Sequence, residues 1–169
     1  MTTRSIDFIL SVYLPCDDPD NLVEFTKCLA TIAAIIADSN VEAAFMSGDF
    51  NADPRKAFGG ELSRFCSEND LICVDEELLP KESFTYLREA HETRSWLDHI
   101  LTTPAARRTV VSVKIDKGVY CSVYEPLTVN CNFGVIVGKT IIITDTEASS
   151  YSLGKQRPKT NRCIYSTIM

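Results

Sequence analysis

The order of the predicted elements limits the fold of this 169-residue sequence more than any other feature. Residues 6–14 read IDFILSVYL, a run of aliphatic, β-branched and aromatic types that is typical of a strand buried on both faces. Asp18 and Pro19 then offer an N-cap and a first-turn proline, and an apolar stripe at spacings of three and four predicts a helix to about Asp38. Residues 43–48, AAFMSG, predict a second strand, so the chain begins as an α/β domain.

The rest of the chain is predicted to hold one short helix and several strands. Gly59 and Gly60 precede the predicted helix, and the acidic triplet DEE after Val74 is predicted to be a loop. The helix is expected at about 61–68, and strands at 71–74, 83–87, 95–102, 109–115 and 127–133. We therefore expect one mixed α/β layered domain over residues 1–138. Residues 139–169 are polar, basic and aperiodic, which predicts a tail or linker.

Composition and charge restrict the classes of partner. The chain is 45% hydrophobic and 24% charged, as expected for a globular protein with a core, and its net charge is −6. The charge is uneven, because 139–169 hold five Lys/Arg against two acids while the remainder holds twelve against twenty-one. An acidic body is a poor general nucleic-acid binder and suits divalent cations, although solubility alone also explains it.

Targeting and cysteine usage predict an intracellular protein of the cytoplasm or nucleus. No apolar run approaches the roughly 18 residues of a membrane helix, so no membrane partner is expected. The first apolar run contains Asp7 and lacks a small-residue cleavage site, which argues against a signal peptide. Seven cysteines without a CxxC pair, with only two histidines, give poor support to a structural zinc site and indicate free thiols in a reducing compartment.

The stretch FMSGDFNADP places polar side chains at the end of the second predicted strand. Asp49 and Asn51 are two residues apart, so both can face one crevice while Phe50 faces the core. A carboxylate can take a proton from water and an amide can hold an oxygen of a phosphate ester. The alternative is an Asx turn in which Asn51 and Asp53 bind their own backbone, and spacing alone leaves both interpretations open.

The stretch SWLDHILTT places a second carboxylate inside a predicted strand. Asp98 is expected in mid-strand, where it costs several kcal/mol unless it is paired or reaches solvent, and such a residue usually orients a histidine or a metal. Alternation sends His99 to the opposite face, so we expect His99 to be a hydrogen-bonded structural histidine. His91 lies in a polar stretch and is expected to be solvated.

These motifs together resemble a known superfamily. GDFNA followed by SWLDHIL resembles the endonuclease/exonuclease/phosphatase superfamily, and SFTY ahead of SWLDH is similar to the endonuclease domains of LINE-type retrotransposons. VYLP, with Tyr13 and Pro15, is similar to the tyrosine-proline strand end that lines that family's cleft. The four segments match in order and spacing over residues 6–133.

The resemblance implies a fold and a chemistry. It implies a four-layer α/β sandwich, two mixed β-sheets flanked by helices, of which this chain would be a part truncated at its N-terminus. It implies hydrolysis of DNA phosphodiester bonds with Mg²⁺ or Mn²⁺. By resemblance, Asp49 would activate the attacking water, Asn51 would hold the scissile phosphate, Tyr13 would line the cleft, and Asp98 would orient a catalytic histidine.

The sequence departs from the family in the motif that supplies this histidine. Where the family has SDHxPL, residues 122–127 read SVYEPL, so Val123 and Tyr124 stand at the Asp and His positions. Val123 ligates nothing, and a tyrosine with an ordinary pKa near 10 brings no positive charge at neutral pH. Loss of one preorganised donor typically lowers the rate by ~10²–10³. The sequence therefore predicts impaired catalysis.

A second departure is that no segment before Ile6 matches the family's N-terminal half, which supplies an Asn and a Glu as metal ligands. Asp49 is then at most the one remaining metal ligand. A sandwich without those strands would have open sheet edges, which predicts self-association. We expect a catalytically impaired fragment of a retrotransposon-type endonuclease. Two alternatives stay open: a non-catalytic nucleic-acid or protein interaction module, and an active phosphodiesterase with a rearranged site that uses Tyr124.

Overall fold

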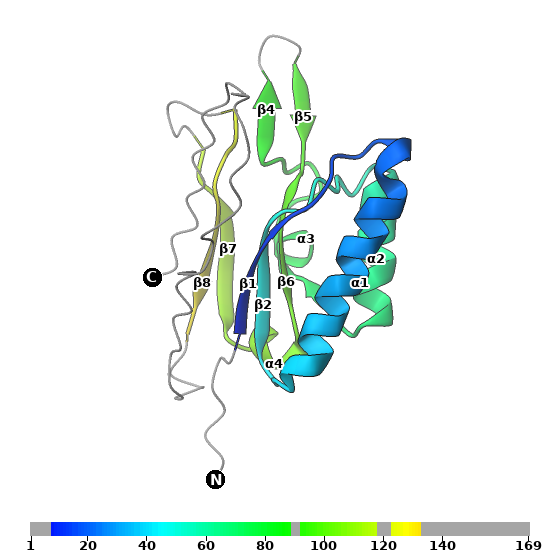
Figure 1. The fold of residues 1–169 in the computed structure, drawn as a ribbon. Helices are drawn as coiled ribbons and strands as arrows, with labels where there is room; N and C mark the ends of the chain where they lie inside the picture. The colour runs from blue at the N-terminus through cyan, green and yellow to red at the C-terminus, as the bar shows by residue number, and fades with distance from the viewer. Residues whose placement is uncertain (1–7, 89–91, 118–122, 133–169) are drawn as a thin grey trace, which may run out of the picture.

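The structure is a computed structural model that describes residues 8–88, 92–117 and 123–132. Its centre is a four-stranded mixed sheet in the order β1-β2-β6-β3 (Figure 1). β1 runs parallel to β2, and the other two neighbouring pairs are antiparallel. The strands span Phe8–Tyr13 (β1), Ala44–Asp49 (β2), Ile72–Cys73 (β3) and Asp98–Thr102 (β6). The predicted α/β class is confirmed, and β1 is an edge of the described sheet.

Two helices, α1 (Leu22–Ser39) and α2 (Ala57–Glu68), cover one face of this sheet (Figure 1). They meet through Phe25 and Phe58, both fully buried, whose ring centroids lie 4.2 Å apart. A short 3-10 turn over Pro19–Asn21 precedes α1, and the Asp18 carboxylate accepts a hydrogen bond from the Asp20 amide there, so the predicted helix start is confirmed. Burial of the apolar stripe of α1 therefore fixes this layer.

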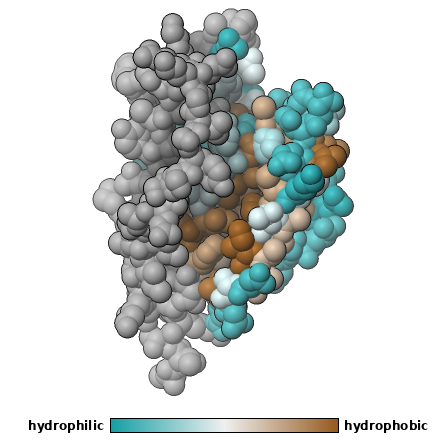
Figure 2. All heavy atoms as spheres, in the orientation of Figure 1, coloured by the Kyte–Doolittle hydropathy of each residue, from teal (hydrophilic) through white to brown (hydrophobic). Residues whose placement is uncertain are grey.

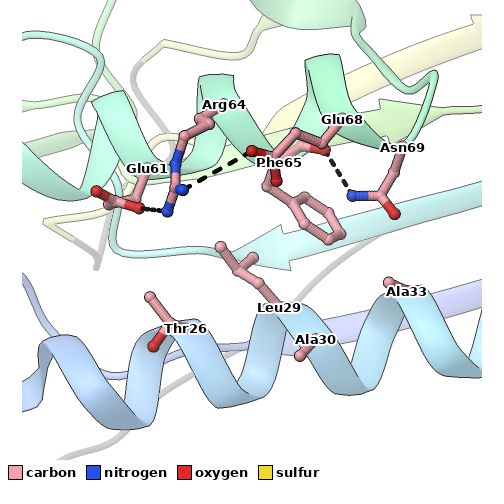
Figure 3. A pocket seen from close by; sticks show the side chains of 9 residues that line it. All are labelled: Thr26, Leu29, Ala30, Ala33, Glu61, Arg64, Phe65, Glu68 and Asn69. Atoms are coloured by element: carbon pink, nitrogen blue, oxygen red, sulfur yellow. Dashed lines mark hydrogen bonds and ion pairs between the residues drawn. The ribbon is translucent and has the colours of Figure 1, made fainter.

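A shallow groove runs between α1 and α2 on the outside of the helix layer (Figure 3). Leu29, Ala30 and Phe65 contribute its apolar part. Arg64 spans its charged rim by pairing with Glu61 and Glu68. These pairs are exposed, so they stabilise α2 only slightly.

The opposite face of the sheet packs on a two-stranded antiparallel ribbon formed by β7 (Val110–Ile115) and β8 (Leu127–Cys131) (Figure 1). Phe45 of β2 and Ile100 of β6 are buried under this ribbon with apolar side chains from both of its strands. The described part of the chain is therefore layered as helices, sheet and ribbon. It contains several sheets and flanking helices, of which the four-stranded sheet is mixed and the two-stranded ones are antiparallel.

The remaining elements are short. A β-hairpin, β4 and β5, projects from the end of the molecule toward which β1 and β2 run (Figure 1). The hairpin spans Tyr86–Arg88 (β4) and Thr93–Ser95 (β5), and the short helices span Val74–Leu78 (α3) and Pro104–Arg107 (α4). Thr103 caps α4, because its hydroxyl accepts the Ala106 amide hydrogen.

Three sequence predictions about these elements are wrong in detail. The helix predicted at 61–68 begins at Ala57 and includes Gly59, which packs so closely on the Asp53 carbonyl oxygen that a Cβ would lie 2.1 Å from it. The predicted DEE loop is helix α3, whose first turn buries an acidic residue against the sheet. The predicted strand 95–102 is two strands, β5 and β6, separated at Trp96. Each of these elements makes tertiary contacts that local sequence propensity does not report.

The surface retains several apolar side chains. Figure 2 shows tan and brown side chains gathered between the polar outer edge of the helices and the grey atoms. Ile9 and Tyr13 of β1 are 51% and 59% exposed, and Val23 of α1 is 65% exposed. Within the described ranges, no helix is long and apolar enough to cross a bilayer. The free thiols there are those of Cys16, Cys28, Cys66, Cys73 and Cys131.

Candidate active site at the strand ends

Three of the predicted site residues meet at the ends of three neighbouring strands. In the sheet register, Tyr13 of β1 pairs with Asp49 of β2, and Asp49 pairs with Asp98 of β6. Because paired residues on adjacent strands share a face, these side chains lie together on one face of the sheet, where the strands end. Tyr13 is exposed, and the two carboxylates are half-buried. Asp98 is the first residue of β6, so the predicted mid-strand position is wrong, and the carboxylate lies at the rim.

The GDFN segment holds this edge together through its backbone. Gly48 has φ +145°, and a Cβ there would lie 2.0 Å from the Val12 carbonyl oxygen, so the close approach of β2 to β1 requires glycine. The amides of Phe50 and Asn51 both donate to the Leu97 carbonyl, at 2.9 and 3.1 Å. The GDFN and LDHI segments are thus joined directly.

Asn51 joins this segment to the third motif. Its side-chain amide donates to the Leu14 carbonyl at 2.7 Å, and its backbone amide donates to the Asp49 carboxylate at 3.0 Å. The Asx-turn alternative is therefore present, but Asp49 makes that turn and Asn51 does not. Asp53 makes the second predicted turn by accepting the Arg55 amide at 3.0 Å. One amide hydrogen of the Asn51 side chain is not used by Leu14, so the side chain still offers a donor.

Thr85, which the sequence analysis quoted within SFTY without a role, positions Asp98. Its buried hydroxyl oxygen accepts hydrogen bonds from the amides of Leu97 and Asp98, both at 3.0 Å, and also bonds the Asp98 carboxylate. Burial raises the pKa of Asp98 to about 6, with a smaller increase from the charge of Asp49. The Thr85 hydrogen bond and the charge of His99 oppose the rise. Near pH 6, Asp98 is therefore partly protonated, so Asp49 and Asp98 together carry less than two negative charges.

The segment that departs from the family motif is held beside this site. Tyr124 forms an antiparallel bridge with Tyr86, closed by hydrogen bonds from Leu87 N to Val123 O and from Glu125 N to Thr85 O, both at 2.7 Å. The Tyr86 and Tyr124 rings make an edge contact with centroids 5.2 Å apart. Ser122 lies outside the described residues, as does His91.

His99 lies on the opposite face of β6, as predicted, and is fully buried. Its Nδ1 lies 2.8 Å from the Asp75 carboxylate and its Nε2 lies 2.9 Å from the Ala52 carbonyl. Burial lowers the pKa of His99, but the charge and hydrogen bond of Asp75 outweigh it and raise the pKa above its usual value. The Trp96 ring stacks on the imidazole with centroids 6.0 Å apart. The predicted structural role of His99 is confirmed.

Metal ligands are distributed unequally between the two faces. At the strand ends, Asp49 and Asp98 are two carboxylates in register, which matches the one or two carboxylates that usually hold Mg²⁺ together with water. In the described part of the chain, a cluster of three different ligand types occurs only on the helix side, at Cys73, Glu76 and His99.

Comparisons with known proteins identify proteins of similar fold. No family model matches the chain, and no curated protein matches it by sequence. Among solved structures it is similar to a 3'-5' exonuclease from Neisseria meningitidis, with TM-score 0.60, 17% identity, and coverage of 73% of this chain and 60% of that one. It is also similar to the endonuclease domain of TRAS1, a telomere-specific non-LTR retrotransposon, with TM-score 0.54, 17% identity, and coverage of 70% and 54%.

A third structure carries the superfamily name. An endonuclease/exonuclease/phosphatase family protein from Bacteroides thetaiotaomicron matches with TM-score 0.51, 15% identity, and coverage of 70% of this chain and 47% of that one. The chain therefore spans about half to three-fifths of the length of these proteins. Low identity limits the comparison to architecture, and within that limit the motif-based resemblance is confirmed: the chain has the endonuclease/exonuclease/phosphatase fold.

Proposed function

We propose that the strand-end site receives a phosphodiester of DNA, and that this chain is a relative of retrotransposon endonucleases with impaired catalysis. The observation that carries the proposal is the alignment of Tyr13, Asp49 and Asp98 across three strands, with Asn51 bonded to the same edge. A second support comes from the fold, because the similar Neisseria protein has been captured with a product DNA hairpin.

Each strand-end residue has a proposed task. Asp49 would take the proton of the attacking water or contact the metal, and the second amide hydrogen of Asn51 would bind a phosphoryl oxygen. Mg²⁺ or Mn²⁺, bound by Asp49 with help from Asp98, would offset the charge that gathers on the phosphoryl oxygens. Tyr13, which is exposed, would line the cleft.

Impairment follows from the residues around Asp98. Its carboxylate is engaged by Thr85, and Tyr124, at the position of the family histidine, packs on Tyr86. A phenol with an ordinary pKa near 10 brings no positive charge at pH 7, so it cannot replace a protonated imidazole as an electrostatic partner. This site would therefore bind a phosphodiester better than it cleaves one.

Nicking of supercoiled plasmid with Mg²⁺ tests the catalytic part of the proposal. We expect the wild-type chain to nick no faster than the Asp49→Ala variant. The double variant Val123→Asp/Tyr124→His restores the family motif and should nick faster than wild type, with the gain abolished by Asp49→Ala. Wild-type nicking at ordinary nuclease rates that disappears in Asp49→Ala would instead establish the alternative, an active phosphodiesterase with a rearranged site.

A group of cations beside Thr85 favours DNA binding in particular. Arg94 lies over the Phe84 ring at 5.1 Å and Lys117 lies over it at 5.4 Å. Both cations are exposed, so the hairpin and the end of β7 present positive charge next to the strand-end site of an acidic protein. Phosphate contacts of this kind supply most of the salt-dependent affinity for DNA.

Fluorescence anisotropy with a labelled duplex tests the binding part. Arg94→Glu/Lys117→Glu should weaken binding at least about tenfold and reduce the slope of log affinity against log salt by roughly two. Lys27→Glu is the control, because Lys27 is also exposed but lies on α1. Affinity that is indifferent to salt, or equally weakened by Lys27→Glu, would refute a DNA surface at the hairpin.

We also propose that the chain self-associates through β1. This strand is an edge of the described sheet and exposes Ile9 and Tyr13, and unpaired apolar edges promote strand pairing between molecules. Sedimentation velocity should show a concentration-dependent dimer that Ile9→Lys shifts to monomer. A monomer at all concentrations would refute it.

A further inference from the structure

A cluster of unlike metal-binding side chains lies under the helix layer, away from the strand-end site. Cys73 ends β3, Glu76 lies in α3, and His99 lies in β6 on the face opposite to Asp98. One donor atom from each of the three lies within 4.8 Å of the other two. The Cys73 sulfur is 3.6 Å from His99 Nδ1, and a Glu76 oxygen is 4.0 Å from the same nitrogen.

A fourth possible donor, Asp75, contacts two members of this cluster. Asp75 is fully buried, and one of its oxygens lies 2.8 Å from His99 Nδ1 while the other lies 3.4 Å from the Cys73 sulfur. The Ile100 amide donates to the second oxygen at 2.7 Å, which fixes the carboxylate in place. Asp75 therefore contacts the Cys73 sulfur and the His99 nitrogen, and a Glu76 oxygen lies within 4.8 Å of both of these atoms.

We propose that Cys73, Asp75, Glu76 and His99 bind a single divalent cation of the zinc class. In a tetrahedral zinc site, bonds of ≈ 2.3 Å to sulfur and ≈ 2.0 Å to nitrogen place those two atoms roughly 3.5 Å apart, which agrees with the 3.6 Å separation of Cys73 and His99. A thiolate and an imidazole favour zinc, whereas Mg²⁺ and Ca²⁺ prefer oxygen donors.

The remaining hydrogen bond of His99 is an independent indication. Its Nε2 lies 2.9 Å from the Ala52 carbonyl, which fixes Nε2–H as a donor and directs Nδ1 into the cluster. Metal-binding histidines usually donate their other N–H to a carbonyl or carboxylate in this way. The cation would replace the proton on Nδ1 and the proton on the Cys73 sulfur, and both protons would leave to solvent.

Access and geometry assign the site a structural role. Glu76 is the most exposed member, with a side chain that is 33% exposed, so it can open the cluster and can move toward the other donors. Four protein ligands would leave no open position, as in structural zinc sites. The cation would join β3, α3 and β6, and this role does not depend on the phosphodiester chemistry proposed at the strand ends.

Zinc and cobalt titrations of the metal-stripped full chain test the site. We expect one zinc per chain by elemental analysis, a higher melting temperature with zinc, and a cobalt complex with sulfur-to-cobalt charge-transfer absorption and four-coordinate d–d bands. Cys73→Ser should abolish the charge-transfer absorption. Cys73→Ser and Glu76→Gln should each weaken zinc binding by at least about 100-fold, more than a lost outer-shell contact.

Two matched variants serve as controls. Cys28→Ser changes a part-buried thiol on α1, and Glu77→Gln changes the neighbouring carboxylate, which binds Arg107. Both should bind zinc like wild type. Neither Cys73→Ser nor Glu76→Gln removes the His99–Asp75 pair, and circular dichroism of each metal-free variant checks the fold. Failure of the wild type to bind one zinc, or charge-transfer absorption retained in Cys73→Ser, would overturn the proposal.

Discussion

The two faces of β6 lie beside two buried or half-buried aspartates, Asp75 and Asp98, that differ in their partners. On the helix side, Asp75 is fully buried and bonds His99, the Ile100 amide and the Cys73 thiol. At the strand ends, Asp98 lies at the rim, bonds Thr85, and has its pKa raised to about 6 chiefly by burial. The Asp75 carboxylate is stabilised by the positive charge of His99, and the Asp98 carboxylate lies beside that of Asp49.

The difference teaches how to separate structural acids from functional ones in this fold. A carboxylate that gains a cation and amide donors has a favourable charged form and contributes to stability. A carboxylate that is buried beside a second carboxylate is destabilising when charged, chiefly through burial, so the fold retains it at a cost that suits a binding or catalytic site. Substitutions on the two faces should therefore change stability in opposite directions.

The largest effect is expected on the helix side. Asp75→Ala leaves the His99 imidazole, and the Ile100 amide, buried without the carboxylate. Removal of one partner of a buried ion pair typically costs about 3–5 kcal/mol in the free energy of unfolding, which urea denaturation would measure. Asp38→Asn, at an exposed position of α1, is the control and should change stability little. Equal midpoints for Asp75→Ala and wild type would show that this pair does not stabilise the fold.

At the strand ends, the opposite sign is expected. The raised pKa of Asp98 means that the folded state holds a proton that the unfolded state has lost between about pH 4 and pH 6, so stability falls as the pH rises through that window. Asp98→Asn removes this dependence and should stabilise the chain at pH 7 by up to about 3 kcal/mol, since the pKa rises from 3.8 to about 6 and one pKa unit is worth 1.36 kcal/mol. Urea denaturation at pH 4, 5, 6 and 7 would measure it. If Asp98→Asn destabilised the chain at pH 7, the expected difference in sign between the two faces would be refuted.

Asp53 extends the comparison to a third carboxylate, and it belongs with Asp75. Burial raises its pKa, but hydrogen bonds from the Arg55 side chain and from the Arg55 and Trp96 amides outweigh burial and lower it to about 2. Its stabilisation is therefore present above about pH 4 and is lost as the pH falls toward 2.

Asp53→Asn should cost about 1–3 kcal/mol at pH 7, because the buried Asp53 carboxylate would be replaced by a neutral amide that forms no ion pair with Arg55 and accepts fewer hydrogen bonds. The difference between wild type and variant should shrink from pH 4 to pH 2, as followed by thermal unfolding. A difference that stays constant over this range would mean that the ion pair with Arg55 does not carry the effect.

Sequence patterns predicted the layers and the strand-end site better than the boundaries. Asp49 and Asp98 were each predicted to be site residues, and the sheet register pairs them. Alternation correctly separated His99 from Asp98. The role of Thr85 could have been suspected only from the motif SFTY, since its contact with Asp98 spans two elements. Asp75 was missed because an acidic triplet looks like a solvated loop, and burial of one member depends on a histidine 24 residues away.

The same long-range pairing explains why cysteine spacing gave poor support to a zinc site. Cys73 and Glu76 are three residues apart, but His99 comes from β6, and the pairing of β3 with β6 brings it to them. Local spacing detects metal sites whose ligands lie within one loop or helix, so the distant histidine hid this one.

The smallest effect is expected one residue away from the cluster, at Glu77. Its carboxylate accepts two hydrogen bonds from Arg107, both at 2.9 Å, but its side chain is 48% exposed. Exposed ion pairs contribute about 0–1 kcal/mol and are screened by salt, so Glu77→Gln should shift the urea midpoint slightly at low salt and not at high salt. A loss as large as that of Asp75→Ala would mean that α3 is held by its outer rim, and that burial is the wrong criterion for dividing the acids of this chain into structural and functional groups.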